Sequence, residues 1–198
     1  WAENGTTSTR VQTTVQQFIE IESAVEGEIL SEGEGESIGG EGEFDRIYSG
    51  GVGTEDDPYQ VSSVADWNRL TATPDDWDKH FVLTASIDFS GATLVPIGNG
   101  AIHFNGVLDG AGHVVSNGVI SYPSSLSVGL FTYVGTKGTI QSLCAENMTV
   151  SGEYQVGGLV GRNRGTLMSC FANGSVIATG DYGEAGGLVG LNSGKIRA

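Results

Sequence analysis

From residue 127 onward, hydrophobic and polar positions recur along the chain at a nearly fixed spacing. The segment GEYQVGGLVGRNRGTL (152–167) returns as GDYGEAGGLVGLNSGKI (180–196), with an offset of 28 residues that becomes 29 after one insertion. A looser copy precedes both at 128–140. A period of this length is typical of one small structural unit that is stacked repeatedly.

Each copy contains short β-forming runs, such as GGLVG, GTLMSCF and GSVIA, separated by Gly, Asn, Ser and Thr. No run is long enough for a helix, so each copy holds about three strands and three turns. The pattern predicts an all-β fold, a right-handed parallel β-helix (solenoid) in which each coil hydrogen-bonds to the next at ~4.8 Å. Inward side chains of successive coils are expected to form two apolar columns, Leu130/Leu159/Leu188 and Ile140/Leu167/Ile196.

Glycine and asparagine recur at fixed places in the repeat. The glycine pairs at 157–158 and 186–187 are expected where the chain turns with positive φ or where coils approach without Cβ collisions. Asn163 and Asn192 suit stacked left-handed turns whose side chains bond along the axis. The segment 104–117 alternates around an Asp-Gly turn, which also suits a hairpin, but its place one period upstream favours an early coil.

One stretch of the chain predicts a helix. Residues 64–70 (VADWNRL) follow Ser62 and Ser63, either of which suits the N-cap position. Trp67 and Leu70 would lie against the open end of the β-stack, so this helix is expected to be a short cap over the first coil.

Residues 1–25 form an N-terminal arm whose apolar positions alternate with more polar ones, which predicts an extended β-strand. A helical interpretation, with Phe18 and Glu22 on the apolar face, is less apolar. Because a lone strand needs a sheet edge, we expect it to dock either on its own domain or on a neighbouring subunit. The arm residues expected to mediate assembly are Val11, Val15, Ile19 and Ile21.

Charge separates the arm from the repeats. Residues 1–47 carry 11 of the 24 acidic side chains against two arginines, and the part from 26 to 47 reads as an acidic Gly/Glu-rich linker. The solenoid domain is then 48–198. The first residue, Trp1, is a weak sign of signal-peptide cleavage and hence of export.

Composition and net charge limit the classes of function that this chain can have. The net charge of −15 disfavours binding to nucleic acid or to anionic membranes, and no apolar run reaches the ~18 residues of a membrane span. Glycine, at 32 of 198 residues, favours turns over helices.

Few residues suggest enzymatic chemistry. Asp88 and Asp109 are placed in neighbouring coils and form the one candidate carboxylate pair for glycoside hydrolysis, although Asp in an Asp-Gly turn is commonly structural. Only Arg162 and Arg164 stand together, which is too few basic residues for a lyase acting on acidic sugars. No catalytic residue is therefore assigned.

Metal and redox chemistry have equally modest support. The three histidines, at 80, 103 and 113, lack zinc spacing. Calcium could bind near Asp56, Asp57 and Asp76 if their two loops meet, the alternative being a solvated acidic loop. Cys144 and Cys170 could approach on neighbouring coils, but one position out of register, so two free and mostly buried thiols are preferred.

The chain resembles the bacterial GLUG-motif repeat proteins, whose repeat is centred on GGLVG, a following Asn and Gly, and then a strand bearing Cys or an aromatic residue. The resemblance covers roughly 48–198. It implies an extracellular, often surface-attached protein with adhesin-like neighbours and no established catalytic residues. The matching stretches are 157–171 and 186–196, with a lead-in at 49–61, 67–70, 76–81, 87–89 and 96–98.

These observations predict a secreted or cell-surface structural protein without enzymatic activity. The last repeat stops at 195–198, before its second strand, so we expect Leu188 and Ile196 to lie at an open edge where copies associate head to tail into a filament. Other surface proteins or a glycan are the further partners expected. The alternative is a secreted module that binds or degrades polysaccharides, as a lyase or a glycoside hydrolase.

Overall fold

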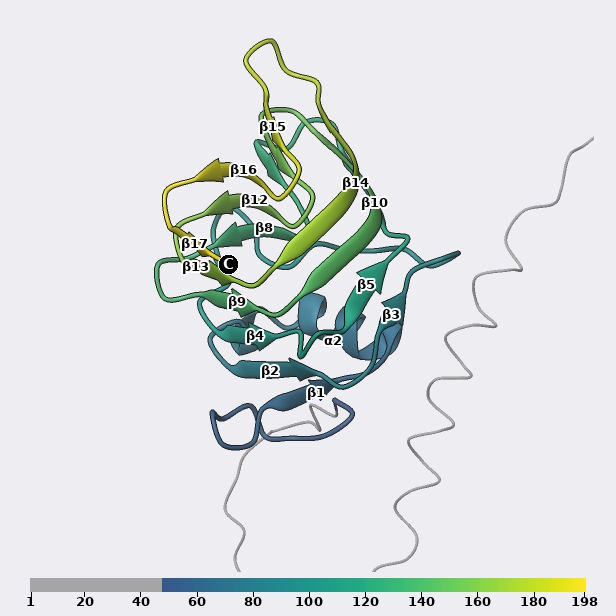
Figure 1. Ribbon diagram of the computed structural model, residues 1–198, viewed down its shortest axis with the longest axis vertical. Helices are drawn as coiled ribbons and strands as arrows, with labels where there is room; N and C mark the ends of the chain where they lie inside the picture. The colour runs from purple at the N-terminus through teal and green to yellow at the C-terminus, as the bar shows by residue number, and fades with distance from the viewer. Residues whose placement is uncertain (1–47) are drawn as a thin grey trace, which may run out of the picture. The chain divides into compact units, whose positions relative to one another are not determined.

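The strands of residues 48–198 pair in the parallel sense. The computed structural model describes residues 48–198, and all named strand pairs within them are parallel. Figure 1 shows the coils following one another from β1 to β17. The predicted parallel β-solenoid is confirmed. The arm with Val11, Val15, Ile19 and Ile21 and the linker at 26–47 lie outside the described residues.

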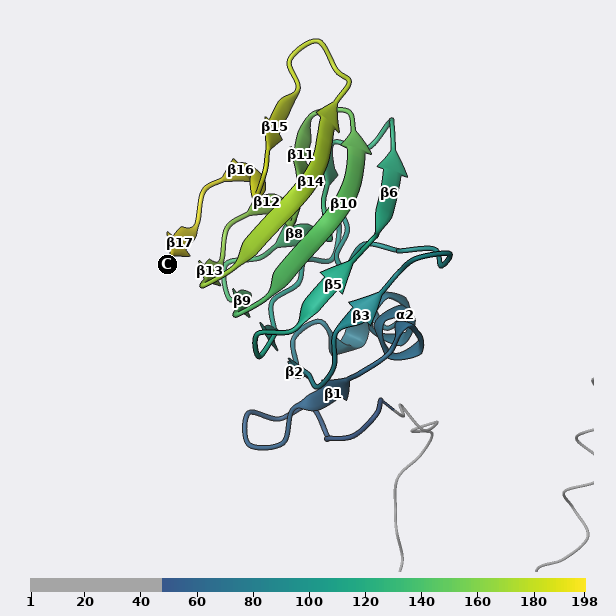
Figure 2. The same cartoon turned by 45° about the vertical axis from the view of Figure 1, so that its right-hand side comes forward.

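Four sheets run along the stack. In spatial order, sheet A contains β1 (Tyr59–Val61), β2 (His80–Leu83), β4 (Val107–Asp109), β9 (Thr139–Gln141), β13 (Thr166–Met168) and β17 (Lys195–Arg197). Sheet B, seen most openly in Figure 2, contains β3 (Ile87–Asp88), β5 (Val114–Ser116), β10 (Cys144–Gly152) and β14 (Phe171–Ala178), and β6 (Val119–Tyr122) also pairs with β10. Sheet C contains β8 (Phe131–Val134), β12 (Val160–Asn163) and β16 (Val189–Asn192). Sheet D contains β7 (Ser127–Val128), β11 (Gln155–Gly157) and β15 (Glu184–Gly186).

A complete coil therefore contributes strands to four sheets, and the expected number of three strands was wrong. The coil that starts at β9 continues through β10, β11 and β12. Gly157 is the last residue of β11 and Gly158 follows it before β12, so the glycine pair divides one side of the coil into two short strands that belong to different sheets. Residues without side chains permit this bend, which a strand-forming pattern alone does not show.

Both predicted apolar columns are present. Leu167 faces Ile140 on one side and Ile196 on the other. The N–H of Leu159 donates to the carbonyl of Leu188 (3.0 Å), and Leu130 and Leu159 are fully buried. Burial of a leucine side chain stabilises a fold by roughly 1.5–3 kcal/mol, so each column contributes substantially to holding the coils together.

The glycine pairs permit close approach of the backbone, whereas the expected positive φ is absent there. A Cβ on Gly157 would lie 2.1 Å from the carbonyl oxygen of Val160, and one on Gly158 would lie 2.3 Å from that of Gly187. Neither glycine pair belongs to the positive-φ residues. Collision, not backbone handedness, is the reason for Gly157, Gly158 and Gly186, whereas a Cβ on Gly187 would contact nothing within 4 Å among the described residues.

The predicted hydrogen bond between the side chains of Asn163 and Asn192 is also confirmed, whereas the left-handed backbone conformation predicted for them is wrong. The Nδ2 of Asn163 donates to Oδ1 of Asn192 (2.7 Å), and Asn163 Oδ1 accepts from the N–H of Gly165 (3.0 Å). Left-handed asparagines occur instead at Asn117 and Asn147, where Asn147 Nδ2 donates to Asn117 Oδ1. The same ladder chemistry therefore stabilises two corners of the coil, but only one of them is left-handed.

The predicted cap is a helix, α2 (Val64–Ala72), followed by a short 3-10 helix, η1 (Pro74–Asp76). Ser63 is the N-cap, and its Oγ accepts from the N–H of Asp66 (3.2 Å). Trp67 and Leu70 are completely buried. The Trp67 ring packs edge to face against Phe89 and Phe131, at centroid distances of 6.2 and 6.3 Å, so the helix closes the N-terminal end of the core.

The Asp109-Gly110 turn is a corner of a coil. Its flanking strands β4 and β5 belong to sheets A and B, which excludes the hairpin alternative. Asp109 Oδ1 accepts from the N–H of Ala111 (2.8 Å), and Oδ2 accepts from Nε2 of Gln141 in the next coil (2.8 Å).

Candidate ligand-binding groove

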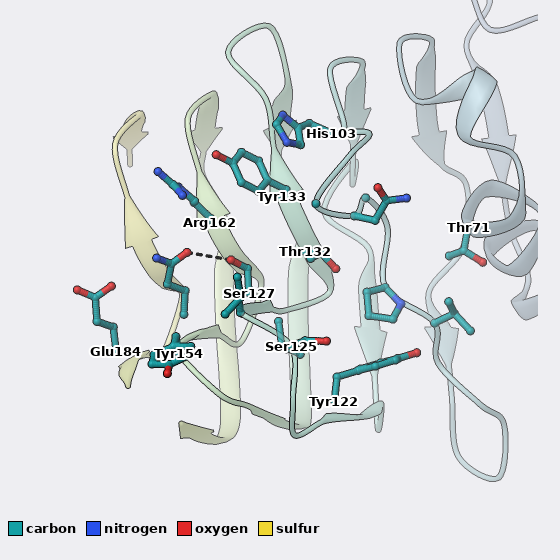
Figure 3. A pocket seen from close by; sticks show the side chains of 18 of the residues that line it. Thr71, His103, Tyr122, Ser125, Ser127, Thr132, Tyr133, Tyr154, Arg162 and Glu184 are labelled. Atoms are coloured by element: carbon teal, nitrogen blue, oxygen red, sulfur yellow. Dashed lines mark hydrogen bonds between the residues drawn. The ribbon is translucent and has the colours of Figure 1, made fainter. Parts of the chain in front are cut away.

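A groove of about 1010 Å³ follows the outer face of the stack. It is bordered by sheets C and D, by the loop 95–103 and by the segment 122–127, and we call it the axial groove (Figure 3). These borders belong to four successive coils, which at ~4.8 Å per coil gives a length of roughly 14 Å. Its volume is that of a small-molecule site, and its shape is elongated along the solenoid axis.

One wall of the axial groove carries a column of polar side chains. Ser127, Gln155 and Glu184 stand at the same register in β7, β11 and β15. The Ser127 Oγ donates to the Oε1 of Gln155 (2.8 Å), the bond drawn in Figure 3. Parallel stacking thus repeats hydrogen-bonding groups once per coil along the groove.

Tyrosines also border the groove, beside the polar column of sheet D. Tyr122 is 41% exposed and Tyr182 is 87% exposed, while Tyr154 is half-buried. Tyr154 lies one residue before Gln155, and its carbonyl accepts from the N–H of Glu184 (2.6 Å), so it belongs to the turn that precedes sheet D. Large exposed aromatic rings that are grouped at a concavity are typical of binding surfaces.

The wall formed by sheet C carries an aromatic and basic cluster. The His103 ring stacks on Tyr133 with the centroids 3.7 Å apart and the planes 8° apart. The Arg162 guanidinium lies 5.4 Å from the centroid of the same Tyr133 ring, and Arg164 lies 5.6 Å away. The buried Nε of Arg162 has no hydrogen-bond partner within residues 48–198, although a charged donor normally has one. The guanidinium of Arg162 lines the groove, whereas its Nε is shielded from it.

The axial groove has little net charge. Among the described residues that line it, Arg162 is the one Lys or Arg and Glu184 is the one Asp or Glu. Hydrolysis of glycosides normally needs two carboxyl groups about 5–9 Å apart, whereas the described lining residues supply one, Glu184.

Asp88 and Asp109, the carboxylates considered for catalysis, are not brought together. Asp88 is in sheet B and Asp109 in sheet A. Asp88 Oδ1 accepts from Nδ2 of Asn117 (2.7 Å) and from the N–H of Ser90 (2.9 Å), and these bonds lower the pKa of Asp88. Both aspartates therefore bond to turns and to adjacent coils, and do not form an acid/base pair.

The acidic loops considered for calcium differ in exposure. Asp56 and Asp57 are exposed, whereas Asp76 is completely buried and accepts a hydrogen bond from the Tyr48 hydroxyl (3.0 Å). Within the part of the chain that the structure describes, no group of three or more His, Cys, Asp or Glu is suited to hold a metal ion. Calcium binding near these residues stays a prediction.

The two cysteines are free and half-buried, and Cys144 pairs with Phe171 rather than with Cys170, in agreement with the expected offset. Burial raises the pKa of both thiols, and for Cys144 the nearby Glu146 raises it further. Neither thiol has the lowered pKa of a reactive cysteine.

Sequence reasoning missed the axial groove, and His103 was assigned no role. One signal was present: Tyr154 and Tyr182 are 28 residues apart, at equivalent positions of the repeat. An aromatic residue that recurs outside the apolar columns points outward from each coil. The loop 95–103, which forms part of the groove, has no counterpart in the repeat, so no recurring residue in the sequence indicated its role.

With the geometry established, comparisons with known proteins identify the repeat. Residues 152–177 match the family described as "The GLUG motif". The chain contains a GLUG motif. The resemblance to GLUG-motif repeat proteins is thereby confirmed, and the matched residues run from the end of β10 through β11, β12 and β13 into β14, so one motif corresponds to about one coil.

Two relatives share larger parts of the chain. Halomucin from Haloquadratum walsbyi is 36% identical in an alignment of 152 residues, and the match covers 72% of this chain and 2% of Halomucin. A protein of Evansella cellulosilytica named as a Gly-rich membrane protein is 30% identical in an alignment of 130 residues, and the match covers 61% of this chain and 15% of that protein. The chain thus spans a small part of both relatives.

A likeness to a solved structure is weaker. The crystal structure of a Bacteroides ovatus protein classed as an immunoglobulin A1 protease has a TM-score of 0.41 and 21% identity, and the match covers 75% of this chain and 66% of that one. A likeness of this size says nothing about function. Within residues 48–198, no helix has the length and hydrophobicity needed to cross a membrane.

Proposed function

We propose that the chain is a non-enzymatic, adhesin-like structural module of a protein displayed on the cell surface or secreted. The observation that carries the proposal is the axial groove, a surface of ordered hydrogen-bonding and aromatic side chains on a continuous stack of coils, with a single carboxylate among its described lining residues. A stack of this kind holds a binding surface in a fixed geometry, because each coil is hydrogen-bonded to the next.

The relatives support a location outside the cytoplasm. One of them is named Halomucin and the other is named as a membrane protein, and the matches cover 72% and 61% of this chain. The acidic composition agrees with this location, because a net charge of −15 is repelled by the phosphates of nucleic acids.

Labelling of intact cells tests the location. An antibody raised against residues 48–198 is expected to stain unpermeabilised cells of the source organism, or to detect the protein in the medium. Detection only after lysis would contradict the proposal. Release of reducing ends or unsaturated sugars from polysaccharides by the purified protein would contradict its non-enzymatic part.

Self-association is the second part of the proposal. Strands β14 to β17 are edge strands within residues 48–198, with Leu188 half-buried and Ile196 48% exposed. An edge of unpaired backbone groups and apolar side chains is able to pair with another parallel coil, and repeated head-to-tail pairing gives a filament. Strand donation through Val11, Val15, Ile19 and Ile21 would add a second contact.

Sedimentation velocity over a range of concentrations tests this part. The wild-type chain is expected to form larger species as its concentration rises. Ile196→Lys is expected to abolish them, while the control Val119→Lys, at an exposed position of β6, leaves them unchanged. A monomer at all concentrations would exclude assembly of this chain.

A further inference from the structure

We propose that the axial groove binds an uncharged polysaccharide, with the sugar chain lying parallel to the solenoid axis. This inference rests on the proposed adhesive function and names the ligand class of its groove. It follows from three features: the repeat distance of the lining groups, their chemistry, and their charge.

The spacing of the lining groups suits a polymer. Ser127, Gln155 and Glu184 are related by the stacking of coils, so equivalent polar groups recur every ~4.8 Å. The sugar rings of an extended polysaccharide recur at a comparable distance. A groove of roughly 14 Å, bordered by four coils, accepts a few consecutive sugar rings.

The chemistry of the lining groups suits sugars. A pyranose has C–H faces that stack on aromatic rings and hydroxyls that need hydrogen-bond partners at the edges. The exposed rings of Tyr122 and Tyr182 offer faces for stacking. The Gln155 amide and the Arg162 guanidinium, which both line the groove, offer the hydrogen bonds. Figure 3 shows Tyr122 and Tyr154 along one border of the groove and Arg162, Tyr133 and His103 along the other.

Charge selects against acidic polysaccharides. The solenoid region 48–198 carries 13 acidic and 7 basic side chains, whereas the groove contains one Arg and one Glu. The surrounding negative field repels polyuronates, and a single Arg cannot neutralise a charge on every sugar. The ligand most compatible with this surface is therefore uncharged.

Affinity electrophoresis in native gels tests the proposal directly. The full chain migrates strongly because of its net charge of −15, and gels that contain a bound polysaccharide slow it. The uncharged probes are hydroxyethylcellulose, mixed-linkage β-glucan, xylan, galactomannan, dextran and soluble starch. The charged probes are alginate and polygalacturonate, and gelatin serves as a probe for an extended peptide.

At least one uncharged polysaccharide is expected to retard the wild-type chain. Tyr122→Ala and Tyr182→Ala are each expected to weaken this binding about tenfold, because each removes one stacking face. Arg162→Gln is expected to weaken it as well. The matched control is Phe171→Ala, which removes an aromatic ring that is 53% exposed in β14 and outside the groove, and it should bind like the wild type.

Four outcomes would overturn the inference: no retardation by any uncharged probe, retardation by the polyuronates alone, retardation by gelatin alone, or equal retardation of all variants. Thermal melts of each variant separate loss of binding from loss of folding. Because the assay uses purified protein, its failure is independent of the cell-labelling experiment that tests the proposed location.

Discussion

Gly158, the second glycine of the first GGLVG repeat, is required by the coil that lies on it. A Cβ at Gly158 would lie 2.3 Å from the carbonyl oxygen of Gly187, which is the equivalent residue of the following coil. At Gly187 itself an added Cβ would contact nothing within 4 Å among the described residues. One repeat position therefore has two different steric environments in the same molecule.

The two alanine substitutions should consequently differ. Gly158→Ala is expected to reduce the free energy of unfolding by about 1–3 kcal/mol, because the neighbouring coil must move away. Gly187→Ala should change it by less than about 1 kcal/mol, and in the stabilising direction, since alanine restricts the unfolded chain. Urea denaturation followed by circular dichroism measures both, and equal losses would show that coil contact is not the reason for the glycine.

Thiol reactivity reports on the environment of the two cysteines. Burial raises the pKa of Cys144 and of Cys170, and the charge and hydrogen bond of Glu146 add to the effect at Cys144. A raised pKa means less thiolate at a given pH, and the thiolate is the species that reacts. Both thiols are therefore expected to react with iodoacetamide more slowly at pH 7.5 than the thiol of glutathione does.

Glu146→Gln isolates the contribution of the carboxylate. This substitution is expected to speed alkylation of Cys144 while Cys170, the internal control, keeps its rate, as mass spectrometry of the peptides would show. The wild-type rate at each site should rise about tenfold per pH unit while the pH stays below the thiol pKa. If Cys144 reacts as fast as glutathione at pH 7.5, its environment is not the one described.

Contacts of single residues could be predicted from the sequence where they depend only on the stacking of equivalent repeat positions. The pairing of Asn163 with Asn192 followed from their equivalent positions in the repeat, and the structure shows it. The backbone conformation could not be predicted in this way. An asparagine side chain can hydrogen-bond along the solenoid axis whether its backbone is left-handed or not. Asn147, which is left-handed, bonds to Asn117 in the same way.

At the scale of elements, the cap helix depends on one carboxylate. Asp66 Oδ2 accepts hydrogen bonds from the hydroxyls of Ser49 (2.7 Å), Ser62 (3.2 Å) and Ser63 (2.9 Å), and from the N–H of Ser62 (2.9 Å). Burial alone raises the pKa of Asp66, but these hydrogen bonds outweigh it, so the pKa lies below its ordinary value of 3.8. The ionised form is therefore the one that holds the first turn of α2 to the residues before it.

The pH dependence of stability follows from this direction. A carboxyl group whose pKa is lowered by folding stabilises the folded state at pH values above its unfolded pKa, and this contribution disappears as the pH falls through the folded pKa. Asp66→Asn is expected to cost about 1–2 kcal/mol at pH 7, because an amide replaces a charged acceptor. Thermal melts from pH 7 to pH 2 should show the difference from wild type shrinking below about pH 4. A difference that stays constant with pH would contradict the role of the charge.

The number of strands per coil shows where element prediction stops. The β-forming runs and their period predicted a parallel stack, and the apolar columns at Leu159 and Leu167 confirm it. The division into β11 and β12 depends on a bend at the glycine pair, which is a property of three-dimensional packing. The helix was predictable because its N-cap serine and its two buried residues, Trp67 and Leu70, lie close together in the sequence.

At the scale of the molecule, the stack was predictable and the groove was not. Repetition specifies the stack, because equal coil lengths bring equivalent residues together. The axial groove also needs His103, from a loop without a counterpart in the repeats, to stack on Tyr133 of the following coil. Contacts between a unique loop and a repeated surface leave no periodic trace in the sequence.

The central claim is that successive coils lie in parallel register, with Leu167 between Ile140 and Ile196. Methyl NOESY spectra of selectively labelled protein measure this directly. The account predicts cross-peaks from the Leu167 methyl groups to the methyl groups of both isoleucines. Absence of both cross-peaks, together with backbone cross-peaks of an antiparallel pattern around Leu167, would contradict the solenoid and with it the groove.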